Sequence, residues 1–172
     1  MVQIIETERL KLRPPERQDA EWLAREIANP KVLQWLTTPP SPYRLTDAHD
    51  FLESRAGLPN IRVIVGQEPL GVVGLEPTRG APFELGYWLQ ESAWGNGYMT
   101  EAAGALVDWH FAHHTSDILS GWLSGNDGSA NVLEKLGFVR EKPVERWANF
   151  HGRKMPLERV RLKKSVYARR NA

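Results

Sequence analysis

The sequence predicts an α/β fold, in which a mixed β-sheet carries helices on its faces. Two observations lead to this class. Segments with the alternating or continuous apolar patterns of strands interleave with amphipathic helical segments along all 172 residues. The composition, 41% hydrophobic and 25% charged, is ordinary for a globular protein, and this length suffices to bury a sizeable core. Because no repeat, linker or low-complexity stretch divides the chain, we expect residues 1–172 to form a single domain.

The net charge of +1 predicts no strong electrostatic field for nucleic acid or membranes, so we expect neither as a partner. The absence of cysteine excludes disulfides, a thiol nucleophile and cysteine metal ligands. No apolar run approaches the length of a membrane span, and the N-terminus lacks the apolar core of a signal peptide. These observations predict a cytoplasmic protein.

The first predicted element is a strand over 8–14, where Leu10 and Leu12 alternate with basic residues. A helix is predicted over 19–28, because apolar residues recur there at helical spacing. Asn29–Pro30 ends this helix, since the residue before a proline is disfavoured in helical conformation.

A stiff, proline-rich loop over 37–43 precedes a second predicted helix over 47–56, which Thr46 can cap and Gly57 terminates. The basic stretch 161–170 is interpreted as a solvated strand edge followed by a frayed tail. The remaining predicted elements are strands over 61–65, 70–77, 83–89 and 117–124, helices over 100–114 and 129–136 with Gly137 just beyond the latter, and strand patterns near 144–150 and 157–163.

The loop WGNGYM (94–99) separates the strand over 83–89 from a helix that starts near Gly97. Two glycines permit left-handed geometry, so successive backbone amides can point into one concavity beside the positive end of the helix. This arrangement is a seat for a phosphate or diphosphate. A Walker loop would need a GK[ST] triplet, and a dinucleotide fingerprint would need a glycine at Thr100. The diphosphate of coenzyme A fits best, although a lone G-x-G is more often a plain turn.

Four motifs stand in one order along the chain: ETERLKLRP (6–14), ELGYW (84–88), WGNGYMTEA (94–102) and NDGSANVLEKLGF (126–138). With these motifs the sequence resembles the GNAT acetyltransferase superfamily, in its ribosomal-protein N-terminal acetyltransferase branch, over about residues 4–162. The resemblance implies the GNAT fold, a twisted, mostly antiparallel sheet with helices on both faces and central parallel strands that splay apart. Those two strands would be 83–89 and 117–124.

The resemblance also implies acetyl-CoA as co-substrate, held in the notch between the splayed strands, and no metal. Backbone groups of Leu89 and Gln90 would lose their strand partners there and pair with the pantetheine arm. The cofactor-binding residues predicted in this way are Leu89, Gln90, Trp94, Gly95, Asn96, Gly97, Tyr98, Met99, Asn126 and Ser129.

The implied chemistry is direct transfer of an acetyl group to an amine. An α-amine, with a pKa of about 7.7–8.0, needs less help from a base than a lysine at about 10.4. Glu84 is the candidate base, directly or through water, and an exposed or ion-paired strand carboxylate is the equally weighted alternative. The branch implies Ser129 as the proton donor to the leaving thiolate, and Ser129 could equally cap the helix over 129–136. His151 is an alternative base.

By family analogy the acceptor enters between segment 35–43 and loop 147–154, and the predicted substrate-binding residues are Trp35, Tyr43, Trp147, Phe150 and His151. These residues suit a peptide N-terminus or a flat, polar small-molecule amine. The branch often carries an aspartate shortly after the glycine of this loop, but Pro156 stands near that place, so the acceptor stays open. Acyl chain length and oligomeric state, monomer or homodimer, are open as well.

Two other interpretations of these sequence features compete with an acetyltransferase. A catalytically idle acyl-CoA-binding sensor or scaffold would keep the same glycine loop, and it would differ from an enzyme at Glu84 and Ser129. His110 and His114 have the i, i+4 spacing of zinc ligands, but the glutamate of a metalloprotease motif is missing. We therefore expect His110 to belong to a buried helical stripe with Met99, Ala103 and Leu106.

Overall fold

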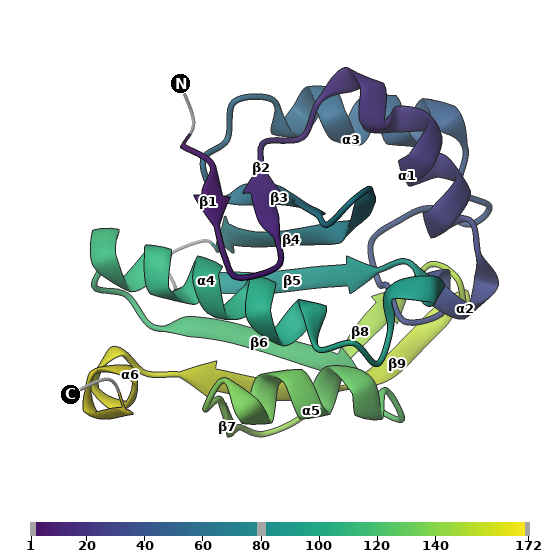
Figure 1. Cartoon of the computed structure of the whole chain (residues 1–172). Helices are drawn as coiled ribbons and strands as arrows, with labels where there is room; N and C mark the ends of the chain where they lie inside the picture. Colours follow the sequence, from purple (N-terminus) through teal and green to yellow (C-terminus); the bar gives the residue numbers. More distant parts are fainter. Residues whose placement is uncertain (1–2, 79–81, 171–172) are drawn as a thin grey trace.

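A computed structural model describes residues 3–78 and 82–170 of the chain, and its centre is one mixed β-sheet (Figure 1). The sheet has nine strands, which are β1 (Ile5–Glu6), β2 (Lys11–Arg13), β3 (Ile61–Val65), β4 (Pro69–Pro77), β5 (Phe83–Leu89), β6 (Ile118–Leu123), β7 (Val139–Arg140), β8 (Val144–Ala148) and β9 (Arg153–Leu162). The described residues form six α-helices, which are α1 (Ala20–Ile27), α2 (Pro30–Leu33), α3 (Leu45–Arg55), α4 (Tyr98–His113), α5 (Asp127–Lys135) and α6 (Lys164–Arg170).

The strand order is β1-β2-β3-β4-β5-β6-β9-β7, and β8 pairs with the free end of β9. The neighbouring strands are antiparallel except β5 and β6, which are parallel and joined through α4. A parallel pair needs such a crossover connection, because the chain must return to the same end of the sheet.

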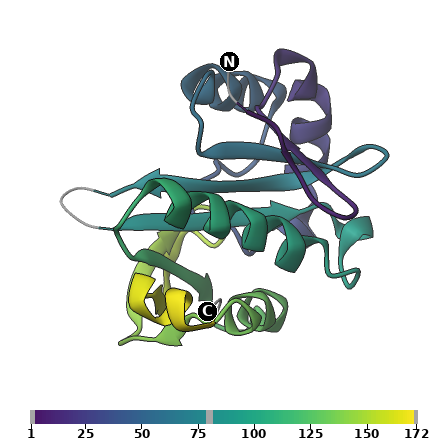
Figure 2. The same cartoon turned by 60° about the vertical axis from the view of Figure 1, so that its left-hand side comes forward.

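The helices cover both faces of the sheet (Figure 2). Helices α4, α5 and α6 pack on one face, where the largest apolar core contains Leu106 of α4 and Leu133 of α5. Helices α1, α2 and α3 cover the other face around a second core that includes Leu23 and Ile61. The fold class expected from the sequence, a GNAT-type mixed sheet between helices, is confirmed.

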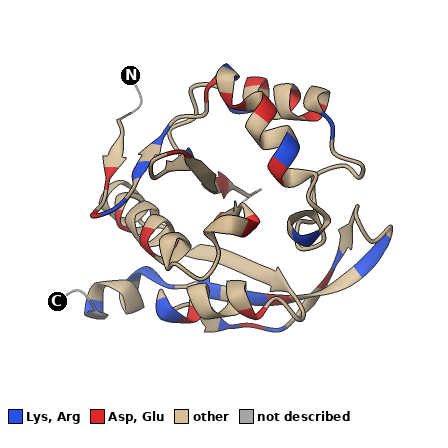
Figure 3. Ribbon diagram, turned by 45° about the vertical axis from the view of Figure 1, so that its right-hand side comes forward, with Lys and Arg blue, Asp and Glu red and all other residues tan. Residues whose placement is uncertain are grey.

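The parallel strands β5 and β6 are in register at two positions alone, Phe83 with Ile118 and Glu84 with Leu119. Beyond these positions β5 continues along β4 to Leu89, and β6 continues along β9 to Leu123. The two strands therefore diverge toward their C-terminal ends, and the resulting gap separates the two halves of the sheet (Figure 3). This is the splay that the resemblance predicted.

Most elements lie where the sequence placed them. The strands over 61–65 and 83–89 are confirmed residue for residue, and His110 is fully buried beside Met99, Ala103 and Leu106 as predicted. No helix within the described ranges is long and apolar enough to cross a membrane.

The strand predicted over 8–14 is shortened to β2, because residues 8–9 form the bend that connects it to β1. Four further details differ from the predictions. Helix α2 begins at Pro30, the residue expected only to end α1, because a proline is tolerated in the first turn of a helix. Thr46 lies inside α3 and does not cap it; instead Asp47 accepts the backbone N–H of Arg44 (2.7 Å). Residues expected to form a frayed tail form α6.

The fourth difference concerns α5, for which Ser129 was considered as the cap, as an alternative to its role as a proton donor. The cap is Asn126, whose Oδ1 accepts the backbone N–H of Ser129 (3.1 Å). The hydroxyl of Ser129 is therefore not used to begin the helix. Gly137 follows this helix at φ +89°, as predicted.

Truncating Leu106 to alanine tests the packing of α4 on the sheet. Leu106 is 0% exposed, so Leu106→Ala should lower the free energy of unfolding by about 2–5 kcal/mol in urea denaturation. The matched control is Leu45→Ala, since Leu45 is a helical leucine with 44% exposure, and its cost should stay below about 1 kcal/mol. Equal losses in the two variants would contradict the packing described here.

Candidate functional site

The glycine loop and the first turn of α4 form an anion seat built from main chain. Gly95 and Gly97 have φ of +77° and +76°, a conformation that strains any residue with a side chain. Gly97 is the N-cap of α4, so the first amides of the helix have no partner within the helix. These N–H groups and the helix dipole favour a bound anion. A diphosphate fits this cradle.

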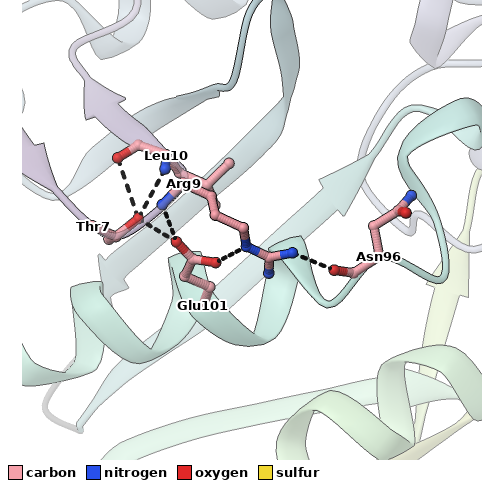
Figure 4. Close-up of polar contacts among 5 residues, drawn as sticks. All are labelled: Thr7, Arg9, Leu10, Asn96 and Glu101. Atoms are coloured by element: carbon pink, nitrogen blue, oxygen red, sulfur yellow. Dashed lines mark hydrogen bonds and ion pairs between the residues drawn. The ribbon is translucent and has the colours of Figure 1, made fainter.

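Residues near the N-terminus hold the back of this loop (Figure 4). The Arg9 guanidinium donates through Nε to Glu101 Oε2 (2.7 Å) and through Nη1 to the carbonyl of Asn96 (3.0 Å). Glu101 Oε1 also accepts bonds from the Thr7 hydroxyl (2.6 Å) and the Arg9 backbone N–H (2.9 Å). The loop is therefore tied to the β1–β2 hairpin, from which it is about ninety residues distant in sequence.

A cleft of about 530 Å³ extends from the anion seat into the splay. Of the predicted cofactor-binding residues, most contribute to its lining, whereas Gln90 and Asn96 do not. Those that line it are Leu89, Trp94, Gly95, Gly97, Tyr98, Met99, Asn126 and Ser129.

The backbone of β5 offers fewer free groups than predicted. The Gln90 N–H donates to the carbonyl of Leu70 (2.8 Å), so it keeps its strand partner, contrary to the prediction. The carbonyl of Leu89 accepts a hydrogen bond from Nε1 of Trp94 (2.9 Å). The backbone N–H and C=O groups of successive residues in a strand point to opposite sides. The carbonyl of Leu85 points toward β6, since it accepts a hydrogen bond from the Ser120 hydroxyl (2.8 Å). By the same alternation, the backbone groups of residues 87 and 89 face the splay.

Ser129 and Tyr87 meet at the inner end of the cleft. The Tyr87 hydroxyl lies 2.8 Å from Ser129 Oγ and 3.2 Å from the carbonyl of Ser129. Burial raises the pKa of Tyr87, which the bond to Ser129 offsets in part, so the phenol stays protonated at neutral pH. Tyr87 was matched to the family motif, but sequence reasoning gave it no role in the chemistry.

A second cleft, of about 520 Å³, opens on the other side of the splay. Eight residues line both clefts at their junction, and they are Trp35, Leu36, Leu85, Gly86, Tyr87, Trp88, Gly121 and Trp122. The two clefts therefore form one passage through the gap between β5 and β6. A thioester entering from one side and an amine entering from the other would meet at this junction.

Glu84 lies in the wall of the second cleft, and two arginines hold it. Its Oε1 accepts bonds from Arg159 Nη1 (2.9 Å) and Arg146 Nη1 (3.1 Å). The side chain is about a quarter exposed, at 24%. Glu76 of β4 stands directly opposite Glu84 and forms its own ion pair with Arg55 (3.1 Å). Glu84 therefore has the contacts of an ion-paired strand carboxylate, which was the alternative to its role as a base. Its Oε2 has no hydrogen-bond partner among the described residues.

The predicted substrate-binding residues divide into two groups. Trp35 and Tyr43 line the second cleft, and burial, with Asp47 and Asp50 nearby, raises the pKa of Tyr43 to about 12. The other three lie outside the described lining of both clefts, and they are Trp147, Phe150 and His151.

These three belong to the β8–β9 hairpin, which closes over the segment before Tyr43. Asn149 donates its backbone N–H to the carbonyl of Thr37 (3.2 Å) and its Nδ2 to the carbonyl of Thr38 (2.9 Å). His151 Nε2 bonds the carbonyl of Gln34 (2.9 Å). His151 therefore fastens the hairpin to the segment.

The histidines of α4 show the contacts of packing residues. His110 Nε2 bonds the carbonyl of Ser116 (3.0 Å), and its ring stacks on His114 at 4.9 Å. Burial lowers the pKa of His110, which favours the neutral ring. Within the ranges that the structure describes, no group of three or more His, Cys, Asp or Glu residues could hold a metal ion.

Comparison with known sequences gives a family match. The model of the family described as "Acetyltransferase (GNAT) domain" matches residues 9–139. An uncharacterised N-acetyltransferase, p20, of Bacillus licheniformis is 27% identical over 173 aligned residues, which cover 94% of this chain and 97% of the relative.

Solved structures show the same fold. A ribosomal-protein-S5-alanine acetyltransferase from Vibrio fischeri superposes with a TM-score of 0.79, at 21% identity, over 96% of this chain and 98% of the other. A spermidine N-acetyltransferase from Vibrio cholerae, solved with CoA and spermine, has a TM-score of 0.77 and 19% identity, over 94% of this chain and 99% of the other. At such identities the likeness extends to the fold alone.

Replacing Gly95 tests the anion seat. Gly95→Ala introduces a side chain at φ +77° and should weaken binding of coenzyme A about tenfold in calorimetry, because the loop amides move out of line. Gly57→Ala is the matched control, since Gly57 has φ +73°, equally open surroundings and no place in either cleft. Both variants should lose similar stability, of about 1 kcal/mol. If both substitutions weakened the binding of coenzyme A to the same extent, the assignment of the anion seat to this loop would be contradicted.

Proposed function

Since the family model matches residues 9–139, this chain belongs to the GNAT acetyltransferases, and we propose that it moves the acetyl group of acetyl-CoA to a primary amine. The observation that carries the proposal is the junction of the two clefts at Gly86, Tyr87 and Gly121, where the sheet splays. One cleft contains an anion seat suited to a diphosphate, and the other opens toward aromatic and charged side chains.

The residues present fit coenzyme A, and the cofactor would supply an acetyl group activated as a thioester. The amides from Gly95 to Met99 would hold its diphosphate, and the splayed backbone at residues 87 and 89 would pair with its amide-bearing arm. The exposed ring of Trp94, at 42%, offers an apolar surface beside the seat.

In the reaction, the neutral amine nitrogen forms a bond to the acetyl carbon, and the carbon–sulfur bond breaks. The amine loses a proton, and the thiolate that leaves gains one. Glu84 is the group in the second cleft that could accept the proton, directly or through water, because its Oε2 has no hydrogen-bond partner among the described residues. Arg146 and Arg159 would fix its position.

Ser129 is the proposed donor to the thiolate, and Tyr87 would orient the Ser129 hydroxyl while keeping its own proton. The Tyr87 hydroxyl is 2.8 Å from Ser129 Oγ, and the raised pKa of Tyr87 keeps its proton in place. Because Asn126 caps α5, the Ser129 hydroxyl is free for this second bond. The proposal therefore assigns Ser129 as the donor and Tyr87 as the residue that positions it.

The acceptor is proposed to be a protein N-terminus or a small-molecule amine. The motifs of the ribosomal-protein branch favour the first, and the structural neighbours include both a ribosomal-protein acetyltransferase and a spermidine acetyltransferase. The chain is proposed to act in the cytoplasm, as a monomer or homodimer.

A second candidate function is a catalytically idle acyl-CoA sensor. One observation favours it: Oε1 of Glu84 accepts hydrogen bonds from two arginines, so one of the two carboxylate oxygens is already occupied by ion pairs. The two candidates separate in one experiment, in which acetyl-CoA is mixed with a panel of amines, including peptides with free N-termini and polyamines, and release of CoA is followed. Release with any acceptor supports the enzyme, and binding without release from the whole panel supports the sensor.

Substituting Glu84 and Ser129 tests their proposed roles. Glu84→Gln should lower kcat about 100-fold and Ser129→Ala about tenfold, with the dissociation constant of coenzyme A changed less than about twofold. Glu134→Gln is the control, because Glu134 is an ion-paired glutamate outside both clefts. Normal turnover by the Glu84 and Ser129 variants would remove both assignments while leaving the cofactor cleft intact.

A further inference from the structure

We infer that Arg9 is a positioning residue, which fixes the Asn96–Gly97 peptide so that the Gly97 amide faces the diphosphate of coenzyme A. The inference rests on the proposed function, because it assigns a residue to the same cofactor seat. Arg9 lies outside the lining of the cleft, so its action is exerted through the loop.

The first step is the geometry of one peptide unit. Arg9 Nη1 donates to the carbonyl of Asn96 at 3.0 Å, so this carbonyl is turned toward the β1–β2 hairpin (Figure 4). In a planar trans peptide the carbonyl and the following N–H point in opposite directions. With the Asn96 carbonyl turned to Arg9, the N–H of Gly97 therefore points the other way. The cleft lining agrees, since it includes Gly97 and omits Asn96.

The second step is that the orientation of this peptide must be stabilised by a contact from outside the loop. It joins Asn96 to Gly97, which lies in the left-handed region, and glycine adopts positive and negative φ with nearly equal ease. Rotation of this peptide, through ψ of Asn96 and φ of Gly97, therefore has a small cost and would turn the amide out of the seat. The bond from Arg9 opposes this rotation, and the guanidinium also lies 4.8 Å from the centre of the Tyr98 ring, at the first residue of α4.

The third step is that Arg9 is itself held in place. Glu101 bonds the backbone N–H and Nε of Arg9, and it accepts the hydroxyl of Thr7. The guanidinium can bond Glu101 and Asn96 at once because its donors lie in a rigid planar fork. A lysine has the same charge but a single nitrogen, so it could not be expected to span both acceptors with this geometry.

The ion pair has an electrostatic consequence as well. Glu101 stands in the first turn of α4, where an unpaired carboxylate would repel a diphosphate. Burial raises the pKa of Glu101, but the bonds from Thr7 and Arg9 outweigh this effect and lower it, so the group is ionised at neutral pH. Arg9 could therefore aid cofactor binding by orienting the peptide or by neutralising Glu101, and a test must separate the two.

The test measures two ligands, coenzyme A by calorimetry and pantetheine, which lacks the diphosphate, by ¹⁵N NMR titration. Arg9→Met should weaken coenzyme A about tenfold and leave pantetheine unchanged, and it should reduce the shift of the Gly97 amide signal on addition of coenzyme A. Arg9→Lys, which keeps the charge, should fold normally and weaken coenzyme A by about threefold. Lys11→Met is the matched control, since Lys11 is an ion-paired cation of the same hairpin that touches neither loop nor cleft.

The double variant Arg9→Met with Glu101→Gln separates orientation from neutralisation. Coenzyme A affinity that stays about tenfold weak supports the orienting role, and recovery to the wild-type value overturns it in favour of neutralisation. Unchanged coenzyme A affinity in Arg9→Met, or equal weakening of coenzyme A and pantetheine, would also overturn the inference while leaving the proposed function standing. Failure of the wild-type protein to bind coenzyme A would instead remove the proposed function, and this inference with it.

Discussion

The separation of β5 from β6 is the constraint on which the rest of the structure depends. Two register positions, at Phe83 and Glu84, join the halves of the sheet, and beyond them each strand keeps only its outer neighbour. Backbone groups that a continuous sheet would consume are thereby directed into a gap. The clefts on the two faces meet through this gap, so the same geometric defect creates a place for an extended amide-bearing arm and a route to it from the opposite side.

Main-chain and side-chain groups have different roles at the proposed anion seat. The groups proposed to bind the diphosphate are backbone amides, which carry no net charge and need no desolvated lysine. The side chains around them, from Thr7, Arg9 and Glu101, form a closed set of partners behind the loop. Their net charge is zero, so they shape the seat without competing for its ligand.

The sequence was most informative where signals are local. The strand over 83–89, the glycine loop and the buried face of α4 follow from residue spacing and backbone chemistry within one segment, and the structure agrees with each. Contacts between distant segments could not be predicted in this way. Glu84 meets arginines 62 and 75 residues away, and no local pattern specifies which side chains a neighbouring strand will bring.

The bonds between the β8–β9 hairpin and the segment before Tyr43 have a consequence for how this protein can diversify. Asn149 and His151 bond the main-chain carbonyls of residues 34, 37 and 38, and a carbonyl is present whatever the side chain. Mutations that exchange the side chains at these three positions therefore leave the frame of the cleft intact. Selection can therefore alter the chemistry of the second cleft at Thr37 and Thr38, which line it, in single steps that leave its frame in place.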